Sequence, residues 1–198
     1  MAKPDEAVVR RVLATNGRGS LIRTAVAESW SATMKQYPQR AWWRRKSTHA
    51  GVMWEHSVQN AISMLDGDRG CKVVPHDDTY SFIFEQAVLV RFKKADIELM
   101  SRNYPTLLAT LFHNHEAQLP GFEDLHRVEA AYVLNQYQTN IEWIGIVARQ
   151  EKRVLWHFDL EVQTPTVQLP LPERTETAAQ KVLRPKGLPD VGRADENE

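Results

Sequence analysis

The most regular hydrophobic pattern in the chain lies within residues 71–96. Apolar residues alternate with other residues on both sides of a short polar turn, which is typical of paired β-strands with one buried face. If Phe84 opposes Val88, Phe82 opposes Val90 and one face becomes continuously apolar. The pattern therefore predicts a β-hairpin.

The same register predicts a charged corner where this hairpin leaves the core. It places Asp78 beside Lys94 and Thr79 beside Lys93. This corner is a candidate site. The alternative is a solvated strand end with a weak surface ion pair, because exposed pairs are common and contribute little.

The first third of the chain has apolar residues at helical spacing. This spacing predicts helices over residues 5–14, from Ser20 to Tyr37, and over residues 54–65. Pro38 ends the second helix, and Asp66-Gly67 closes the third.

Alternation returns after residue 125. It predicts a strand over residues 128–134 and a second hairpin from strands 141–149 and 153–160. The register that aligns the apolar residues pairs Ile146 with Trp156 and sets Gly145 opposite His157. A glycine there would leave space for a pocket. Alternatively, His157 is an ordinary histidine on a sheet face.

Together these elements predict an α+β fold. We expect N-terminal helices packed on a largely antiparallel sheet of five to six strands. Residues 1–160 would form one domain, mainly helical over 1–66 and mainly strands over 71–160, and 161–198 would be a proline-containing arm and disordered tail.

Composition describes a globular protein, with 42% hydrophobic and 25% charged residues. No apolar run approaches the roughly 18 residues that span a bilayer, and no secretory hydrophobic region follows Met1. We therefore expect a cytoplasmic protein. The single cysteine, Cys71, excludes an intramolecular disulfide and a multi-cysteine zinc site, and is expected to be a buried thiol.

Charge is balanced overall but unevenly distributed. Residues 1–50 hold ten Lys/Arg and three Asp/Glu, a balance of +7, and the remainder carries −7. Within the basic part, six residues form a candidate partner-binding or nucleic-acid-binding segment: Arg40, Trp42, Trp43, Arg44, Arg45 and Lys46.

Three interpretations fit this segment. Cations and indoles suit single-stranded nucleic acid, through phosphate contacts and base stacking. Tryptophan and arginine also dominate protein-binding hot spots. The third interpretation is that both indoles point into the core and only the basic neighbours are solvated.

His113 and His115 flank one residue, and Glu116 or His126 could add a metal ligand. Because the spacing matches no recurring ligand set, we expect ordinary polar residues and no metal site.

Four segments carry a family resemblance: HDDTYSFIFEQAVLVRFKKAD, RNYPT, RVEAAYVLN and IVARQEKRVLWHFDL. Across roughly residues 50–160 the chain resembles an uncharacterised family of short bacterial proteins, encoded beside regulators that join a helix-turn-helix domain to a zinc-peptidase-like domain. The resemblance implies a toxin–antitoxin or phage-defence pair in which this chain is the effector and the neighbouring gene encodes its protein partner. The resemblance supplies no catalytic residues, and we expect no cofactor.

The element order is also similar to the metal-dependent nuclease fold with a PD-(D/E)xK motif. That resemblance implies a catalytic site of Glu55, Asp78 and Lys93 with Mg²⁺. The chain departs from the motif at Arg91, two residues before Lys93, where an acid is required. A degenerate nuclease-like scaffold and a non-catalytic nucleic-acid-binding protein are therefore the alternatives to the interaction protein.

Overall fold

The computed structural model describes residues 3–76, 79–101 and 106–160. In chain order the elements are α1 (Glu6–Ala14), the 3₁₀ turn η1 (Thr15–Gly17), α2 (Arg18–Gln36), the 3₁₀ turn η2 (Pro38–Trp42), α3 (Lys46–Met64), β1 (Cys71–His76), β2 (Thr79–Phe84), β3 (Val88–Ala95), α4 (Leu107–His113), β4 (His126–Leu134), β5 (Ile141–Gln150) and β6 (Arg153–Asp159).

The six strands form one sheet in sequential order, from β1 to β6. Every neighbouring pair is antiparallel except β3 and β4, which run parallel. A parallel pair requires a crossover, and the connection that contains α4 supplies it. The predicted α+β class, with N-terminal helices on a largely antiparallel sheet, is confirmed.

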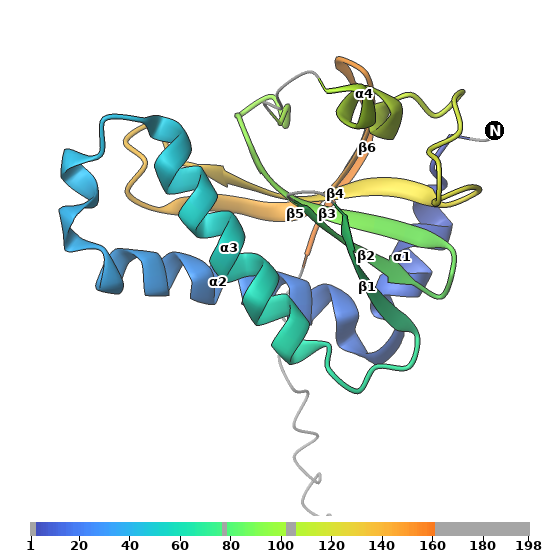
Figure 1. Ribbon diagram of the computed structural model, residues 1–198, viewed down its shortest axis with the longest axis horizontal. Helices are drawn as coiled ribbons and strands as arrows, with labels where there is room; N and C mark the ends of the chain where they lie inside the picture. The colour runs from blue at the N-terminus through green and yellow to red at the C-terminus, as the bar shows by residue number, and fades with distance from the viewer. Residues whose placement is uncertain (1–2, 77–78, 102–105, 161–198) are drawn as a thin grey trace, which may run out of the picture. The chain divides into compact units, whose positions relative to one another are not determined.

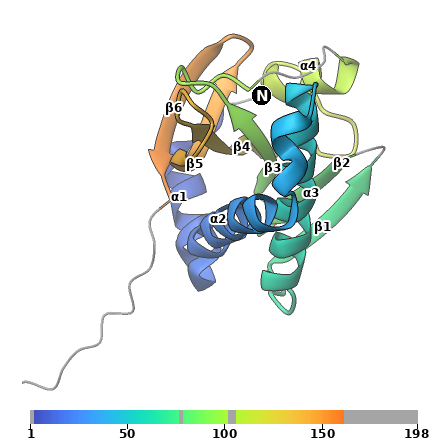
Figure 2. The same ribbon diagram turned by 90° about the vertical axis from the view of Figure 1, so that its left-hand side faces the viewer.

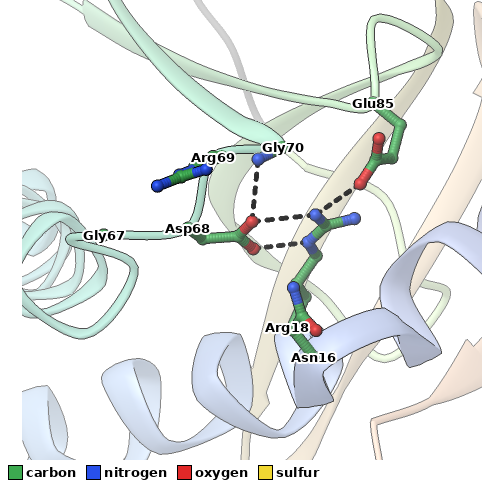
Figure 3. Close-up of a pocket in the computed structure, with 7 residues that line it drawn as sticks. All are labelled: Asn16, Arg18, Gly67, Asp68, Arg69, Gly70 and Glu85. Carbon is green, nitrogen blue, oxygen red and sulfur yellow. Dashed lines mark hydrogen bonds and ion pairs between the residues drawn. The ribbon is translucent and has the colours of Figure 1, made fainter.

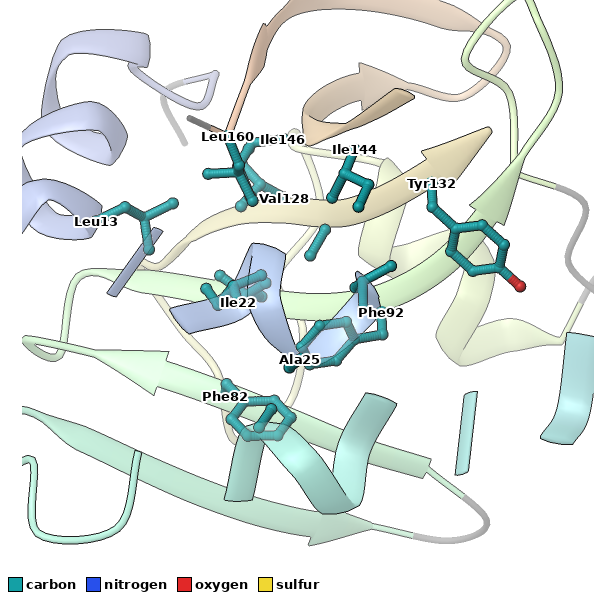
Figure 4. Close-up of a cluster of buried hydrophobic side chains, with 14 of the residues drawn as sticks. Leu13, Ile22, Ala25, Phe82, Phe92, Val128, Tyr132, Ile144, Ile146 and Leu160 are labelled. Atoms are coloured by element: carbon teal, nitrogen blue, oxygen red, sulfur yellow. The ribbon is translucent and has the colours of Figure 1, made fainter. Parts of the chain in front are cut away.

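The sheet is covered on both faces (Figures 1 and 2). Helices α1, α2 and α3 lie on one face, where they bury an apolar core that includes Ile22, Phe82, Phe92, Val128 and Ile146 (Figure 4). Helix α4 covers part of the other face. Its Phe112 packs with residues from β2 and β3.

The predicted register of the first hairpin is confirmed, because Phe82 pairs with Val90 and Phe84 with Val88. The turn depends on Glu85 and Gln86, which have φ angles of 52° and 51°. Neither residue is glycine. Further along the hairpin, Arg91 donates from Nε to Ser81 Oγ at 2.9 Å.

The predicted register of the second hairpin is wrong by two residues. Ile146 pairs with Phe158, and the ladder is irregular between Ala148 and Arg149. A bulge adds a residue to one strand, which alternation alone does not reveal. Because the register differs by an even number of residues, the same side chains remain on the apolar face.

The predicted space above Gly145 is also absent. Gly145 pairs with Asp159, and a Cβ on Gly145 would collide with the indole ring of Trp143. Trp143 donates its Nε1 hydrogen to Asp159 Oδ1. The indole therefore fills the space in which the sequence placed a pocket, and His157 lies exposed opposite Val147.

Two helices start earlier than predicted. Gly17, at φ 67°, starts α2 at Arg18 instead of after Ser20, and α3 begins at Lys46, well before the predicted start. Strand β1 continues through Pro75, which an edge strand tolerates because one side of its backbone needs no hydrogen-bond partner.

Two further expectations can be placed. Cys71 is half-buried, and burial raises the pKa of its thiol to about 11. The predicted arm and tail, residues 161–198, lie outside the described part of the chain. Among the described helices, none has the length and apolar character to cross a bilayer.

Candidate functional site

Helices α2 and α3 form an antiparallel hairpin that extends past the sheet, with η2 at its end (Figure 1). Residues 38–45, which connect the two helices, are called the tip below. Arg40 fixes the tip to α2 by donating hydrogen bonds to the carbonyl oxygens of Met34 (3.1 Å) and Tyr37 (3.2 Å). These bonds satisfy carbonyls at the helix end.

The two tip tryptophans have different environments. Trp43 is half-buried, and its ring centroid lies 5.7 Å from that of Tyr37 and 6.3 Å from that of His49. Trp42 is 83% exposed. The interpretation in which both indoles point into the core is therefore wrong for Trp42, because only Trp43 packs against the helices.

The charge around Trp42 has one sign. Residues 29–54 contain no acid and five cations: Lys35, Arg40, Arg44, Arg45 and Lys46. The side chains of Arg44 and Arg45 are exposed. The tip therefore presents an aromatic ring and guanidinium groups to solvent without a neighbouring carboxylate from residues 29–54.

A polar cluster lies on the other face of the sheet, beneath α4 and its flanking loops. Glu129 of β4 is 1% exposed and accepts a hydrogen bond from Ser101 Oγ at 2.7 Å. Arg149 of β5 lies 3.2 Å from Glu129 Oε2, and its Nη2 lies 2.6 Å from Nε2 of His113. The same His113 nitrogen lies 3.3 Å from Glu129 Oε1.

These contacts set the charge states in the cluster. Burial opposes ionisation of Glu129, but its contacts with His113, Arg149 and Ser101 outweigh this and lower the pKa of the carboxyl. Burial lowers the pKa of His113, and the contact with Glu129 opposes this in part. The cluster is therefore centred on a buried carboxylate–guanidinium pair.

Arg127 attaches α4 to the sheet. Its guanidinium donates to the carbonyl oxygens of Leu111, Asn114 and Ala117, at 2.7, 3.1 and 3.0 Å. His115 adds a hydrogen bond between its Nε2 and the carbonyl oxygen of Arg149, at 2.9 Å. The sequence did not distinguish these buried side chains from surface polar residues.

The residues of the nuclease-like hypothesis are not brought together where the structure describes them. Glu55 is exposed on α3, whereas Lys93 alternates with core-facing Phe92 and points to the opposite face of the sheet. The sheet lies between them. Asp78 is outside the described residues, as is Asp77.

Lys93 and Glu129 do lie on the same sheet face. Burial lowers the pKa of the Lys93 ammonium, and the Glu129 charge raises it in part. Arg91, at the position where the motif needs an acid, is buried and donates to Ser81 and towards His76. Burial lowers its pKa to about 10, which leaves it cationic at pH 7.

The histidines of the metal hypothesis have separate partners. His126 Nδ1 accepts from the Asp5 backbone at 3.3 Å, and Glu116 accepts from Gln150. In the described part of the chain, no group of three or more His, Cys, Asp or Glu side chains could hold a metal ion.

The sequence missed a further ion cluster, which lines an open recess of about 490 Å³ (Figure 3). Arg18, at the start of α2, donates to both oxygens of Asp68 at 2.6 and 2.9 Å and to Glu85 at 2.6 Å. A Cβ on Gly70 would collide with Arg18 and Glu85. These contacts connect three loops, so we interpret the cluster as one that stabilises the fold.

No protein-family model matches the chain, and comparisons with curated proteins and with solved structures find no significant match.

Proposed function

We propose that this chain is an interaction protein that binds a protein partner with an acidic surface through the tip. The observation that supports this most directly is Trp42, a large aromatic side chain exposed at the end of a projecting helical hairpin. Aromatic and arginine side chains dominate binding hot spots. The five cations of residues 29–54 favour an acidic partner.

A protein partner fits the tip better than single-stranded nucleic acid. Proteins that bind single strands stack successive bases on aromatic side chains along a basic groove. Of the two tip indoles, Trp43 packs against Tyr37 and His49, and Trp42 alone stands in solvent. One exposed ring next to arginines can insert into a pocket of a partner protein, but it cannot stack several successive bases.

The partner that we propose is the product of the neighbouring gene, and this chain is the effector of a toxin–antitoxin or phage-defence pair. This part of the proposal rests on the family resemblance of residues 50–160. Expression of this chain alone should slow bacterial growth, and co-expression of the neighbour should restore it. Unchanged growth in the first case would contradict the effector role.

Binding can be tested by isothermal titration calorimetry of the full chain with the purified neighbouring gene product. Trp42→Ala should weaken binding at least about tenfold, because hot-spot truncations cost roughly 2 kcal/mol or more. Leu107→Ala is the matched control, since Leu107 is 74% exposed but lies on α4, on the other face of the sheet.

An unaffected Trp42→Ala variant would overturn the proposed surface. Binding of a single-stranded oligonucleotide that falls steeply with salt and is lost on Arg44→Ala/Arg45→Ala replacement would instead identify a nucleic-acid-binding protein.

A metal-dependent nuclease is the second candidate, because Lys93 and Glu129 share a buried sheet face. Purified protein with Mg²⁺ or Mn²⁺ would then degrade DNA or RNA, and Asp78→Ala would abolish the activity. Cleavage that persists in the Asp78→Ala variant would exclude the proposed catalytic site.

A further inference from the structure

The turn between β4 and β5, residues 135–140, presents a large aromatic side chain to solvent. Tyr137 lies in this turn and is 75% exposed. Tyrosine, like tryptophan, is enriched at binding hot spots, because its ring buries apolar area and its hydroxyl group can form a hydrogen bond. Tyr137 is therefore a candidate anchor for a protein partner.

The turn that carries Tyr137 is closed by its own hydrogen bonds. The side chain of Asn135 accepts from the Thr139 backbone N–H at 2.9 Å and donates to Thr139 Oγ1 at 2.9 Å. The Asn135 backbone accepts from Gln138 N–H at 2.8 Å and donates to the Asn140 carbonyl oxygen at 3.0 Å. The ring thus has a preorganised support, so a partner does not have to order the turn when it binds.

The turn lies at the same end of the molecule as the tip (Figure 1). Lys94, near the end of β3, donates from Nζ to Gln138 Oε1 at 3.1 Å. Burial and the charges of Lys94 and Arg40 lower the pKa of His49. The His49 ring in turn packs against Trp43 of the tip, with the ring centroids 6.3 Å apart. These interactions connect the turn to the tip through the end of β3.

We propose that the surface that binds the partner includes this turn, with Tyr137 as a second anchor in addition to Trp42. This inference rests on the proposed function and adds a requirement to it, since one acidic protein must contact both the helical hairpin and the end of the sheet. Charge favours such a partner, because residues 29–54 and 130–141 together contain five cations and no acid.

A protein partner fits this surface better than an anionic lipid bilayer does. Tryptophan, tyrosine and cationic side chains also occur at membrane interfaces. The strength of membrane binding, however, increases with the apolar area that is inserted. The neighbours of Tyr137 are the exposed amides Gln136 and Gln138, which add no such area but can form the hydrogen bonds of a polar interface rim.

Calorimetry of the full chain with the purified neighbouring gene product tests the second anchor. Tyr137→Ala should weaken binding at least about tenfold, because the truncation of a hot-spot ring has an effect of this size. Gln136→Ala is the matched control, since Gln136 is exposed in the same turn, and it should bind as the wild type does. Unchanged binding of Tyr137→Ala, or equal weakening by both variants, would overturn the role of the ring.

Hydrogen–deuterium exchange tests whether the partner covers both elements. Addition of the neighbouring gene product should slow exchange of the backbone amides in residues 38–45 and in residues 135–140. Protection of residues 38–45 alone would overturn the inference. Vesicles of phosphatidylglycerol should leave exchange in both segments unchanged, and protection by these vesicles would identify a lipid surface instead of a protein partner.

The outcomes also distinguish this inference from the proposed function. If Trp42→Ala weakens binding and Tyr137→Ala does not, the tip remains the binding surface and the second anchor fails. If the neighbouring gene product does not bind at all, both fail.

Discussion

Individual buried charges in this protein are stabilised in two different ways. Glu129 and Arg149 neutralise one another, with Ser101 and His113 as further partners. Arg127, also buried, donates to three backbone carbonyls, and no acid pairs with it among the residues that the structure describes. A buried charge is costly unless paired or hydrogen-bonded, so both solutions depend on partners distant in sequence.

Replacing Glu129 with Gln should strongly destabilise the protein. The change leaves the Arg149 charge buried without its counterion, which costs about 3–5 kcal/mol in comparable pairs. Urea unfolding measures the effect. Glu151→Gln, in the exposed β5–β6 turn, should change stability by less than about 0.5 kcal/mol. Equal midpoints for the two variants would show that the pair contributes nothing net.

Asp68 should make stability depend on pH at the acidic end. Its hydrogen bonds with Arg18 lower the carboxyl pKa to about 2, below the ordinary 3.8. Stabilisation is therefore complete above about pH 4 and is lost as pH falls towards 2.

The test compares the Asp68→Asn variant with the wild type by measuring urea unfolding midpoints between pH 6 and pH 2. The variant should be less stable at pH 6, and its difference from the wild type should shrink below pH 4. Asp66→Asn, an exposed neighbour, should match the wild type throughout. A constant difference for Asp68→Asn would argue against the ion pair.

At the level of elements, α4 depends on contacts from outside itself. A helix of seven residues is unstable alone. Thr106 caps its start by accepting from Ala109 N–H at 3.1 Å, and Arg127 binds carbonyls at and beyond its end. The element is thus held between a cap and a buried guanidinium.

The Arg127→Met substitution should detach α4 locally from the sheet. We expect faster hydrogen–deuterium exchange at residues 107–113, with a smaller change in β1 and β2, because the guanidinium bonds the end of α4 rather than those strands. Equal acceleration across the whole sheet would show that Arg127 supports the global fold instead.

His115 should contribute a second pH dependence. Burial lowers the pKa of its imidazole to about 4, so the unfolded chain binds a proton between about pH 6.5 and 4 while the folded one does not. Stability should therefore fall as pH decreases through this window. His115→Gln should reduce that slope in thermal unfolding. Burial also lowers the pKa of His113 and of His49, and both should contribute to the same slope.

At the scale of the whole molecule, we expect different residues of the tip to control the association rate and the dissociation rate of the partner. The tip cations should accelerate encounter with an acidic partner, and the Trp42 anchor should slow dissociation. Surface plasmon resonance at rising salt should show a falling association rate for the wild type and a weaker dependence for Arg44→Ala/Arg45→Ala. Trp42→Ala should mainly raise the dissociation rate. A reversed pattern would contradict this division.

The sequence predicted the secondary-structure elements better than the contacts between them. Alternation gave the β2–β3 register, because that pattern determines which side chains share a face. It could not show the bulge after Ala148 or the indole of Trp143 above Gly145. Both depend on local geometry that has no periodic signal.

The candidate site was predicted in part. The basic segment was evident from composition, whereas only coordinates distinguish exposed Trp42 from packed Trp43. The Glu129 cluster and the Arg18 ion cluster were missed, because interacting members such as Glu129 and Arg149, or Arg18 and Glu85, are separated by 20 and 67 positions. No local spacing connects such residues.

The parallel contact between β3 and β4 has a consequence for synthesis on the ribosome. Strands β1, β2 and β3 are separated by only a few residues and can pair as soon as they emerge, but the other side of β3 waits until residues 126–134 have been translated. During that delay residues 88–92, apolar except for Arg91, present unpaired backbone to solvent or to other nascent chains. We therefore expect the newly made chain to need chaperone protection most while residues 96–125 are being added.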